Sequence, residues 1–346
     1  GDNLSIHASE GAGTVAGFIA NFGQDSSFAG TKTAQGNQDA NGIGDFYYEP
    51  PNSFLALCSS NLPDVAVVPS EHFNTITYTG NASSSRSITG VGFQPDFVWA
   101  KGRNLVINHG LWDSVRGVTK TLRSNSTLAE TTDANALTSF NSDGFTANAD
   151  TLLNGSYNYV AWNWKAGTSV SGNSTGSGDD LAYTGSVNTA AGFSIIRYLG
   201  NQVSGHQIPH HLSAVPDAII IKNLTTQSWN CFFPNTSMGA TKGLQLDNTG
   251  AQGTVSHLNN TMPSTSVVTL GTGAGTNTRD GNSDPQPYIM YSFANKDGYS
   301  KVGTYEGNAS TDGTFVYTGF RPSLIICKSI DDSNHWEMLD NTRDVD

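Results

Sequence analysis

The chain has 346 residues, of which 13% are charged and 10% are aromatic, and its formal net charge is −12. The aromatic content argues against a disordered chain. A negative field repels phosphate backbones and anionic lipid, so we expect no nucleic-acid partner. No apolar stretch approaches the ~20 residues of a membrane helix, so we expect no membrane insertion.

The first 57 residues combine short apolar pieces with a polar loop rich in Gly and Asn. The run NFGQ at 21–24 is followed by Tyr48, by two prolines at 50–51 and by the apolar run at 54–57. This order resembles the closing strands of a SPRY-type, concanavalin-like sandwich, an ending found in phage structural proteins. The resemblance implies that residues 1–57 are the C-terminal part of such a domain. Residues 58–72 contain two prolines and are expected to form a linker.

Three short runs share one pattern, in which a Pro precedes several apolar residues and a Lys closes the run. They lie at residues 97–100, 218–221 and 324–327. An apolar run without alternation suits a strand covered on both faces. A leading Pro is tolerated because the first strand residue need not donate to the ladder. We therefore expect three buried strands at equivalent places.

The order of motifs around these runs repeats along the chain. We expect one unit at 73–166, a second at 182–297 and the start of a truncated third at 298–346. The third unit follows the first at a constant offset of 227, which carries Asp113 to Asp340. Such repetition indicates an array of like domains, each long enough to bury its own core. Residues 167–181 are rich in Gly, Ser and Thr and are expected to be a flexible linker.

The predicted fold class is all-β, with tandem β-sandwich domains of jelly-roll or concanavalin-like type and very little helix. No stretch carries a long 3.6-residue apolar period with caps. The segment at 157–164 alternates with period two, as a half-buried strand does.

Few residues are candidates for a site, and no catalytic residue, cofactor or metal centre is expected. Trp99, Trp112, Trp162 and Trp164 lie in the first unit, where the core is the favoured place for them and a sugar-binding surface is the alternative. Strand alternation ties Trp112 down less than the other three, so it is the candidate carbohydrate-binding residue. Asp280, Asn282 and Asp284 offer oxygen ligands at alternating positions, which makes them a weak calcium candidate beside the alternative of a turn. Asp113 and Arg116 recur in the third unit and favour a structural ion pair over a site.

The repeats resemble an uncharacterised repeat domain of phage tail-fibre and virion appendage proteins, cyanophages among them. The motifs that carry the resemblance are a GFxPDFVW run at 92–99, LWDSVRG at 111–117 and YVAWNWKAG at 159–167. The second unit departs from the second motif, where it reads CFFPN at 231–235. The resemblance implies no catalytic residues.

These observations lead to a hypothesis of a non-enzymatic structural protein on the surface of a phage virion. It would be a tail fibre or related fibre of tandem β-domains that serves host attachment. The expected partners are other virion proteins and further copies of the chain, with a trimer as the analogy. The alternatives are a glycan-binding, lectin-like receptor module and, less favoured, a depolymerase of host polysaccharide, which would need a carboxylate pair in a groove.

Overall fold

The computed structural model describes residues 19–61 and 67–343, which belong to two compact units at 1–65 and 66–346. In these described ranges, helical structure is limited to two short 3-10 turns, η1 (Ser59–Asn61) and η2 (Pro69–Glu71). Strands, turns and loops make up the rest, so the all-β prediction is confirmed. Within the described ranges, no helix is long and apolar enough to cross a membrane.

The first unit is organised around the carboxylate of Asp39. Its Oδ1 accepts hydrogen bonds from the backbone N–H of Asn41 and of Ile43, at 2.9 and 3.0 Å. Its Oδ2 accepts from Ala56 N at 2.8 Å and from Asn61 Nδ2 at 2.6 Å. Residues 19–61 contain no named strand, so the resemblance to a SPRY-type ending stays a prediction here. Both 3-10 turns fall in the expected linker at 58–72.

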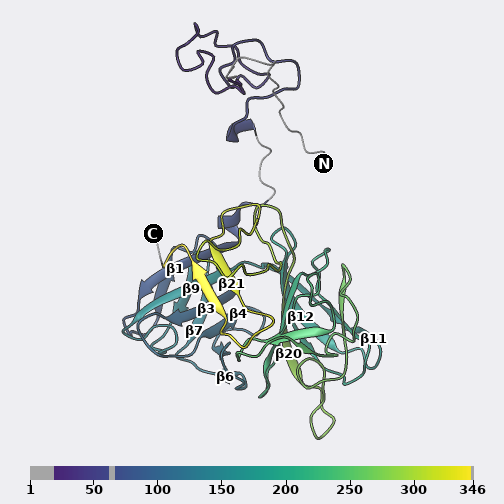
Figure 1. Cartoon of the computed structure of the whole chain (residues 1–346). Helices are drawn as coiled ribbons and strands as arrows, with labels where there is room; N and C mark the ends of the chain where they lie inside the picture. Colours follow the sequence, from purple (N-terminus) through teal and green to yellow (C-terminus); the bar gives the residue numbers. More distant parts are fainter. Residues whose placement is uncertain (1–18, 62–66, 344–346) are drawn as a thin grey trace. The chain divides into compact units, whose positions relative to one another are not determined.

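The first repeat is built on a four-stranded antiparallel sheet in the second unit (Figure 1). Its strands, in spatial order, are β1 (Phe73–Thr79), β9 (Asn158–Trp164), β3 (Phe97–Gly102) and β4 (Gly110–Asp113). The predicted run at the start of β3 is buried on both faces, since Phe97, Val98, Trp99 and Ala100 are at most 4% exposed.

A second, smaller sheet covers one face of the first. It contains β2 (Arg86–Thr89), β8 (Gly144–Ala147) and β7 (Leu137–Asn141). Between the two sheets lies a cluster that we call the first outer cluster; it includes Ile88, Val98, Ala100, Trp112, Leu137, Phe145 and Ala161. A separate two-stranded ladder is formed by β5 (Lys120–Thr121) and β6 (Thr131–Thr132).

The second repeat has the same two layers. Its large sheet runs in the order β10 (Thr168–Asn173), β12 (Ala182–Asn188), β13 (Phe193–Leu199), β20 (Pro287–Phe293), β15 (Ala218–Asn223), β16 (Trp229–Phe232), β17 (Lys242–Gln245) and β18 (Gly253–Thr254). The small sheet contains β11 (Thr175–Gly176), β14 (His206–Pro209) and β19 (Val267–Leu270). The second outer cluster, which includes Ile208, Ile219, Ile221, Val268 and Met290, lies between them.

The stretch at 167–181 is not the flexible linker that its composition predicts. It forms β10 and β11, and β10 pairs with β12 along its full length, from Thr168↔Val187 to Asn173↔Ala182. A composition rich in Gly, Ser and Thr predicts flexibility only where the backbone of the segment finds no strand to hydrogen-bond with. Here the free edge of β12 offers a full row of donors and acceptors, and the small side chains of the tract pair with it without steric cost.

The third repeat contributes one hairpin, made of β21 (Leu324–Cys327) and β22 (Glu337–Asp340). Its register repeats that of β3 and β4, because Leu324 pairs with Asp340 as Phe97 pairs with Asp113. The run does form a strand, but the prediction that both faces are buried is wrong here. Ile325 is 47% exposed and Ile326 is 40% exposed. The reason is that no described strand or second sheet covers β21 as β9 and the small sheet cover β3.

The three repeats share one core instead of standing as separate beads. We call it the inner cluster; it combines Phe97, Trp99, Leu111, Val160, Trp162 and Trp164 of the first repeat with Phe193, Ile195, Leu224, Trp229, Ile289 and Tyr291 of the second, and Leu324 and Met338 of the third pack against it. Each large sheet therefore turns one face to its own small sheet and the other to its neighbours. This shared core explains why residues 66–346 form one compact unit.

The Lys that closes each run has the same task in all three repeats. The Nζ of Lys101 donates to Ile107 O at 2.7 Å, that of Lys222 to Thr225 O at 2.9 Å, and that of Lys328 to Ser329 O at 2.7 Å. Each ammonium group thus ties down the loop that follows its strand. Burial lowers the pKa of Lys222 to about 8.

Candidate functional site

Trp112 is buried and is not the exposed platform expected of a sugar-binding residue. It has no exposed surface and belongs to the first outer cluster. Its Nε1–H donates to Thr121 Oγ1 at 2.9 Å. The small sheet covers β4 on this face, and the sequence alone did not show that cover, because its strands are short and distant along the chain. A sugar ring in solvent cannot stack on this indole.

The candidate calcium residues belong to a turn. The Oδ1 of Asp280 accepts from the backbone N–H of Asn282 at 2.8 Å and of Asp284 at 2.9 Å. This is the arrangement of an Asx turn, in which the side chain caps its own loop. Among the residues that the structure describes, no group of three or more His, Cys, Asp or Glu side chains could hold a metal ion.

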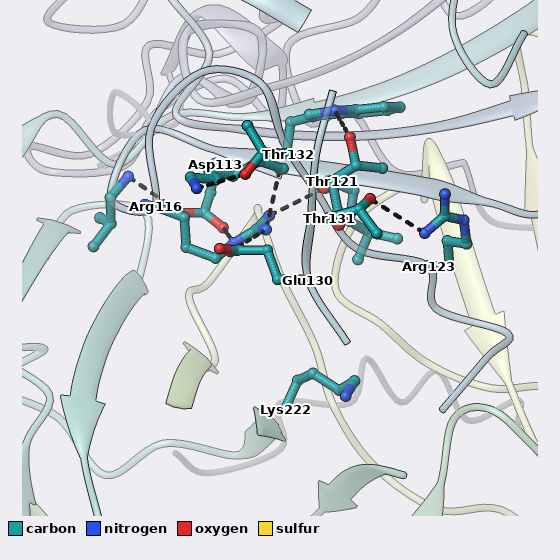
Figure 2. Close-up of polar contacts among 12 residues, drawn as sticks. Asp113, Arg116, Thr121, Arg123, Glu130, Thr131, Thr132 and Lys222 are labelled. Carbon is teal, nitrogen blue, oxygen red and sulfur yellow. Dashed lines mark hydrogen bonds and ion pairs between the residues drawn. The ribbon is translucent and has the colours of Figure 1, made fainter. Parts of the chain in front are cut away.

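The buried ion pair of Asp113 and Arg116 makes a polar contact between the first two repeats. β4 ends at Asp113, whose Oδ1 accepts from the backbone N–H of Val115 at 3.1 Å and of Arg116 at 2.8 Å. This turn brings the Arg116 side chain back, so that its Nε donates to Asp113 Oδ2. Figure 2 shows the guanidinium between Asp113 and Glu130, which accepts from Nη1 at 3.1 Å. Nη2 donates to Leu111 O at 3.0 Å.

A residue of the second repeat completes this group. Tyr291, in β20, donates its hydroxyl to Asp113 Oδ2 at 2.7 Å. The side chains of Asp113 and Arg116 are 0% and 1% exposed. Burial alone would lower the pKa of Arg116, but the charges of Asp113 and Glu130 outweigh it and raise that pKa. Burial raises the pKa of Tyr291 well above its usual value, and the charge of Asp113 adds to this rise. Tyr291 is therefore a protonated donor at neutral pH.

The third repeat carries a copy of this group. Asp340 Oδ1 accepts from Arg343 N at 2.8 Å, and Arg343 Nε donates to Asp340 Oδ2. Trp162, in β9 of the first repeat, donates its Nε1–H to Asp340 Oδ2 at 3.1 Å. The Arg343 guanidinium lies 5.1 Å from the centroid of the Trp162 ring, within the range of a cation–π contact. Each ion pair thus accepts a hydrogen bond from the long central strand of another repeat.

Backbone contacts reinforce the contact between the first two repeats. Glu130 N donates to Leu224 O at 2.9 Å, and Gln227 N donates to Thr127 O at 3.0 Å. Trp229 Nε1 donates to Arg123 O at 2.8 Å. These bonds hold the segment at 123–130, which carries Glu130, against the second repeat. The ion pair and the backbone bonds therefore lie in one interface.

Comparison with known proteins identifies the family of the chain. The model of a family described as "Domain of unknown function (DUF7483)" matches residues 68–346. The chain belongs to this family. The matched range contains all three repeats and their shared core. No curated protein and no solved structure matches the chain significantly.

In this DUF7483 chain, the ion pairs and their hydrogen bonds link one repeat to another. The Asp113 and Arg116 side chains are closed to solvent, and their hydrogen-bond partners are other groups of the protein. Sequence reasoning favoured an ion pair in both places, and the structure shows Asp113 paired with Arg116 and Asp340 paired with Arg343. It missed Tyr291 and Trp162 as partners, because they lie 178 residues from the carboxylates that they contact.

Two further features of this DUF7483 chain are candidates for chemistry. Burial and a hydrogen bond with Asp133 raise the pKa of Asp150 to about 6. Carboxyl groups in such contact are closer than the about 5 Å that glycoside hydrolysis requires, so they do not form its acid and nucleophile. In the first unit, outside the family match, aromatic residues line a cleft; they are Phe22, Phe28, Phe46, Tyr47, Tyr48 and Phe54. Sequence reasoning missed the cleft because its residues have no common period.

Proposed function

We propose that this chain is a non-enzymatic structural protein of a phage virion, a tail fibre or a related appendage, and that it serves attachment to the host surface. The observation that carries the proposal is the inner cluster. The first two repeats bury their large sheets against each other, the hairpin of the third packs against the same cluster, and an ion pair of the first and one of the third repeat each contact another repeat. Such a unit resists bending between its repeats, which suits a load-bearing element better than an enzyme that opens and closes.

The side chains with perturbed pKa values also support a structural role. A catalytic acid or base must reach a substrate, whereas Arg116 and Tyr291 are almost fully buried. Arg116 neutralises neighbouring carboxylates and donates to backbone carbonyls, and Tyr291 donates to a carboxylate. The perturbed pKa values thus belong to structural networks, which perturb pKa values as active sites do.

The two-layer arrangement supports a finer assignment of the fold. We assign each complete repeat to the β-sandwich class, with jelly-roll or concanavalin-like connections. The first and second outer clusters each lie between a large and a small sheet, as the core of a sandwich does. On this proposal, the partners are other virion proteins and further copies of the chain, in a trimer by analogy with other fibres.

A second candidate function, glycan binding, has its own observation. The cleft in the first unit is lined mainly by aromatic rings and two prolines, and Tyr48 and Phe54 are 79% and 68% exposed. Exposed aromatic faces stack on sugar rings. The lectin alternative therefore rests on this cleft, since Trp112 is buried.

Immunogold labelling of purified particles tests the proposal. Antibodies against residues 66–346 should label an appendage on particles of the phage that encodes the chain. Mass spectrometry of the same particles should find the chain as a stoichiometric component. Its absence from particles, with the chain present in the infected-cell extract, would overturn the proposal. A glycan array with the full chain, and with Tyr48→Ala as the matched variant, tests the second function.

A further inference from the structure

One position of the repeat can be followed through all three repeats. It lies directly before the residue that pairs with the last apolar residue of each Pro-led run, and its occupants are His109, Trp229 and Trp336. A second position directly follows the Leu that pairs with the strand after the run. It is Arg123 in the first repeat and Gln245 in the second. These positions allow one interface between repeats to be compared with another.

The first and second repeats meet through the same indole contact as the second and third. Trp229 of the second repeat donates its Nε1–H to Arg123 O of the first at 2.8 Å. Trp336 of the third repeat donates its Nε1–H to Gln245 O of the second at 2.9 Å. In both interfaces the later repeat supplies the indole and the earlier repeat supplies the carbonyl.

A backbone hydrogen bond recurs in the same two interfaces. Glu130 N donates to Leu224 O at 2.9 Å, and Gln252 N donates to Ile330 O at 2.8 Å. The donors are equivalent, because each lies two residues before the last residue of β6 or β18, which form the corresponding short ladders. The acceptors are equivalent, because each lies two residues after the Lys that closes its run. The second and third repeats are therefore related as the first and second are.

The contact of the third repeat with the first uses positions of the first interface. Tyr291 and Trp162 are equivalent, because each pairs with the third residue of its Pro-led run. Tyr291 of the second repeat donates to Asp113 of the first at 2.7 Å. Trp162 of the first repeat donates to Asp340 of the third at 3.1 Å. The first repeat thus contacts the third as the second contacts the first.

Stacked aromatic side chains support this equivalence. In the second repeat, Trp229 and Tyr291 are stacked at a centroid distance of 6.5 Å and an interplanar angle of 19°. In the first repeat, His109 and Trp162 are stacked at 6.4 Å and 11°. The guanidinium of Arg343, from the third repeat, lies over Trp162. The first repeat therefore presents to the third the same stacked pair that the second repeat presents to the first.

We propose that the three repeats form a closed ring of approximate threefold symmetry, in which each repeat binds the next through one directional interface. An interface between two unlike surfaces generates an open filament unless the rotation that it imposes closes. Here the first repeat binds the second, the second binds the third, and the third binds the first, so the rotation closes after three steps. The inner cluster takes side chains from all three repeats, as the centre of such a ring must.

The proposal assigns a partner to each surface of this interface. The surface with Asp113 and Arg123, and the opposite surface with Trp229 and Tyr291, are built to bind another repeat of the same chain and not a separate ligand. This inference goes beyond the proposed function and does not depend on it.

Pulsed electron double resonance on the full chain tests the ring. Pairs of nitroxide labels are attached to Val106→Cys, Thr226→Cys and Ser333→Cys, at exposed positions in the loops that follow β3, β15 and β21. Cys58→Ser and Cys327→Ser remove competing thiols, and Cys231 stays because it is buried. In a ring, the distance between 106 and 333 is at most about one and a half times the mean of the other two distances, whereas an open array makes it about twice that mean. A larger ratio than one and a half would overturn the proposal.

A double-mutant cycle tests whether the third and first repeats meet through this interface. Trp162→Phe and Asp340→Ala are measured singly and together by urea unfolding of the full chain. We expect their effects on the unfolding equilibrium constant to depart from additivity by at least about twofold, because the two side chains are in contact. Trp162→Phe with Asp113→Ala is the matched control and should be additive, since the donor to Asp113 is Tyr291. Additive effects in the first cycle, or equal coupling in both cycles, would contradict the ring.

Discussion

Phe233 stands in the second repeat where Asp113 stands in the first. The pairing of Ile219 with Phe232 corresponds to that of Val98 with Trp112, so the next residues, Phe233 and Asp113, are equivalent. Asp113 receives a hydrogen bond from Tyr291, whereas the Phe233 ring lies 6.4 Å from that of Trp336 in the third repeat. One position of the repeat thus makes a polar contact in one interface and an apolar contact in another.

The hydrogen bond from Tyr291 to Asp113 should contribute measurably to stability. Tyr291→Phe keeps the ring, which stacks on Phe97 at a centroid distance of 4.6 Å, and removes only the hydroxyl. Because the acceptor is a buried carboxylate, we expect a loss of about 1–3 kcal/mol in the free energy of unfolding, measured with urea. Tyr317→Phe, at a residue that is 78% exposed, is the matched control and should change little. Equal effects of the two variants would contradict the role of this bond.

The two ion pairs should differ in what they contribute, because they differ in burial. Arg116→Met leaves Asp113 buried without its cation, and we expect a loss of about 3–5 kcal/mol in the free energy of unfolding. Arg343 is 23% exposed, so water screens its contact with Asp340. Arg343→Met should cost about 1–2 kcal/mol. Chemical denaturation of both variants in the same buffer measures the difference. A loss in Arg343→Met that equals or exceeds the loss in Arg116→Met would show that burial does not decide the effect.

Short-range patterns predicted the strands but not what covers them. The Pro-led runs predicted β3, β15 and β21 because each is a local apolar pattern. The burial of Trp112 depends on β7 and β8, which pair with each other and follow Trp112 only after a long loop. The residues next to Trp112 in the sequence therefore do not indicate that these strands cover it. Exposure of Ile325 is the reverse case: its sequence context matches that of Val98, but its surroundings do not.

The repeats were visible in the sequence, whereas their packing was not. A repeat of about a hundred residues predicts like folds, but it does not say whether neighbours share a core. Phe97 and Trp99 alternate with Val98 along β3, and their side chains enter different clusters. An unbroken apolar run predicts that both faces of a strand are buried, but it does not show which part of the protein covers the second face. That partner is another repeat, which explains why the candidate site is an interface.

Removal of the charge at Asp150 should stabilise the protein at neutral pH. Its folded pKa of about 6 lies above its ordinary value, so its favourable contribution is complete below about pH 4 and is lost as the pH rises through 6. Asp150→Asn keeps the oxygen that accepts from Leu152 N and cannot ionise. We expect the variant to match the wild type near pH 4 and to exceed it by about 1–2 kcal/mol above pH 7, after allowance for solvent screening.

Urea unfolding of Asp150→Asn and wild type at several pH values provides the measurement. Asp297→Asn, at an exposed position, removes the same charge from the surface and controls for the change in net charge. The same gain in stability for both variants at every pH would mean that net charge, and not the contact with Asp133, is the cause.

His109 should make the protein sensitive to acid. Its Nδ1 accepts a hydrogen bond from Trp99 Nε1 at 2.9 Å, and its ring is stacked near that of Trp162. Because an accepting Nδ1 carries no proton, His109 is a neutral imidazole in the folded protein. Burial, together with the charges of Lys101 and Arg343, lowers the pKa of His109 to about 4. The unfolded chain binds the proton at about pH 6.5, so stability from this group is present above that pH and is lost as the pH falls toward 4.

His109→Asn should reduce this loss. Its Oδ1 can accept from Trp99 and does not titrate, so the fall in unfolding free energy between pH 6.5 and 4 should be smaller by about 1–2 kcal/mol than in the wild type. Part of the fall remains, since the pKa of His210 is also lowered to about 4 by burial. His335→Asn, at an exposed residue, is the control. Urea unfolding at pH 4, 5 and 6.5 decides the matter: identical slopes for His109→Asn and the wild type would exclude His109 as the source.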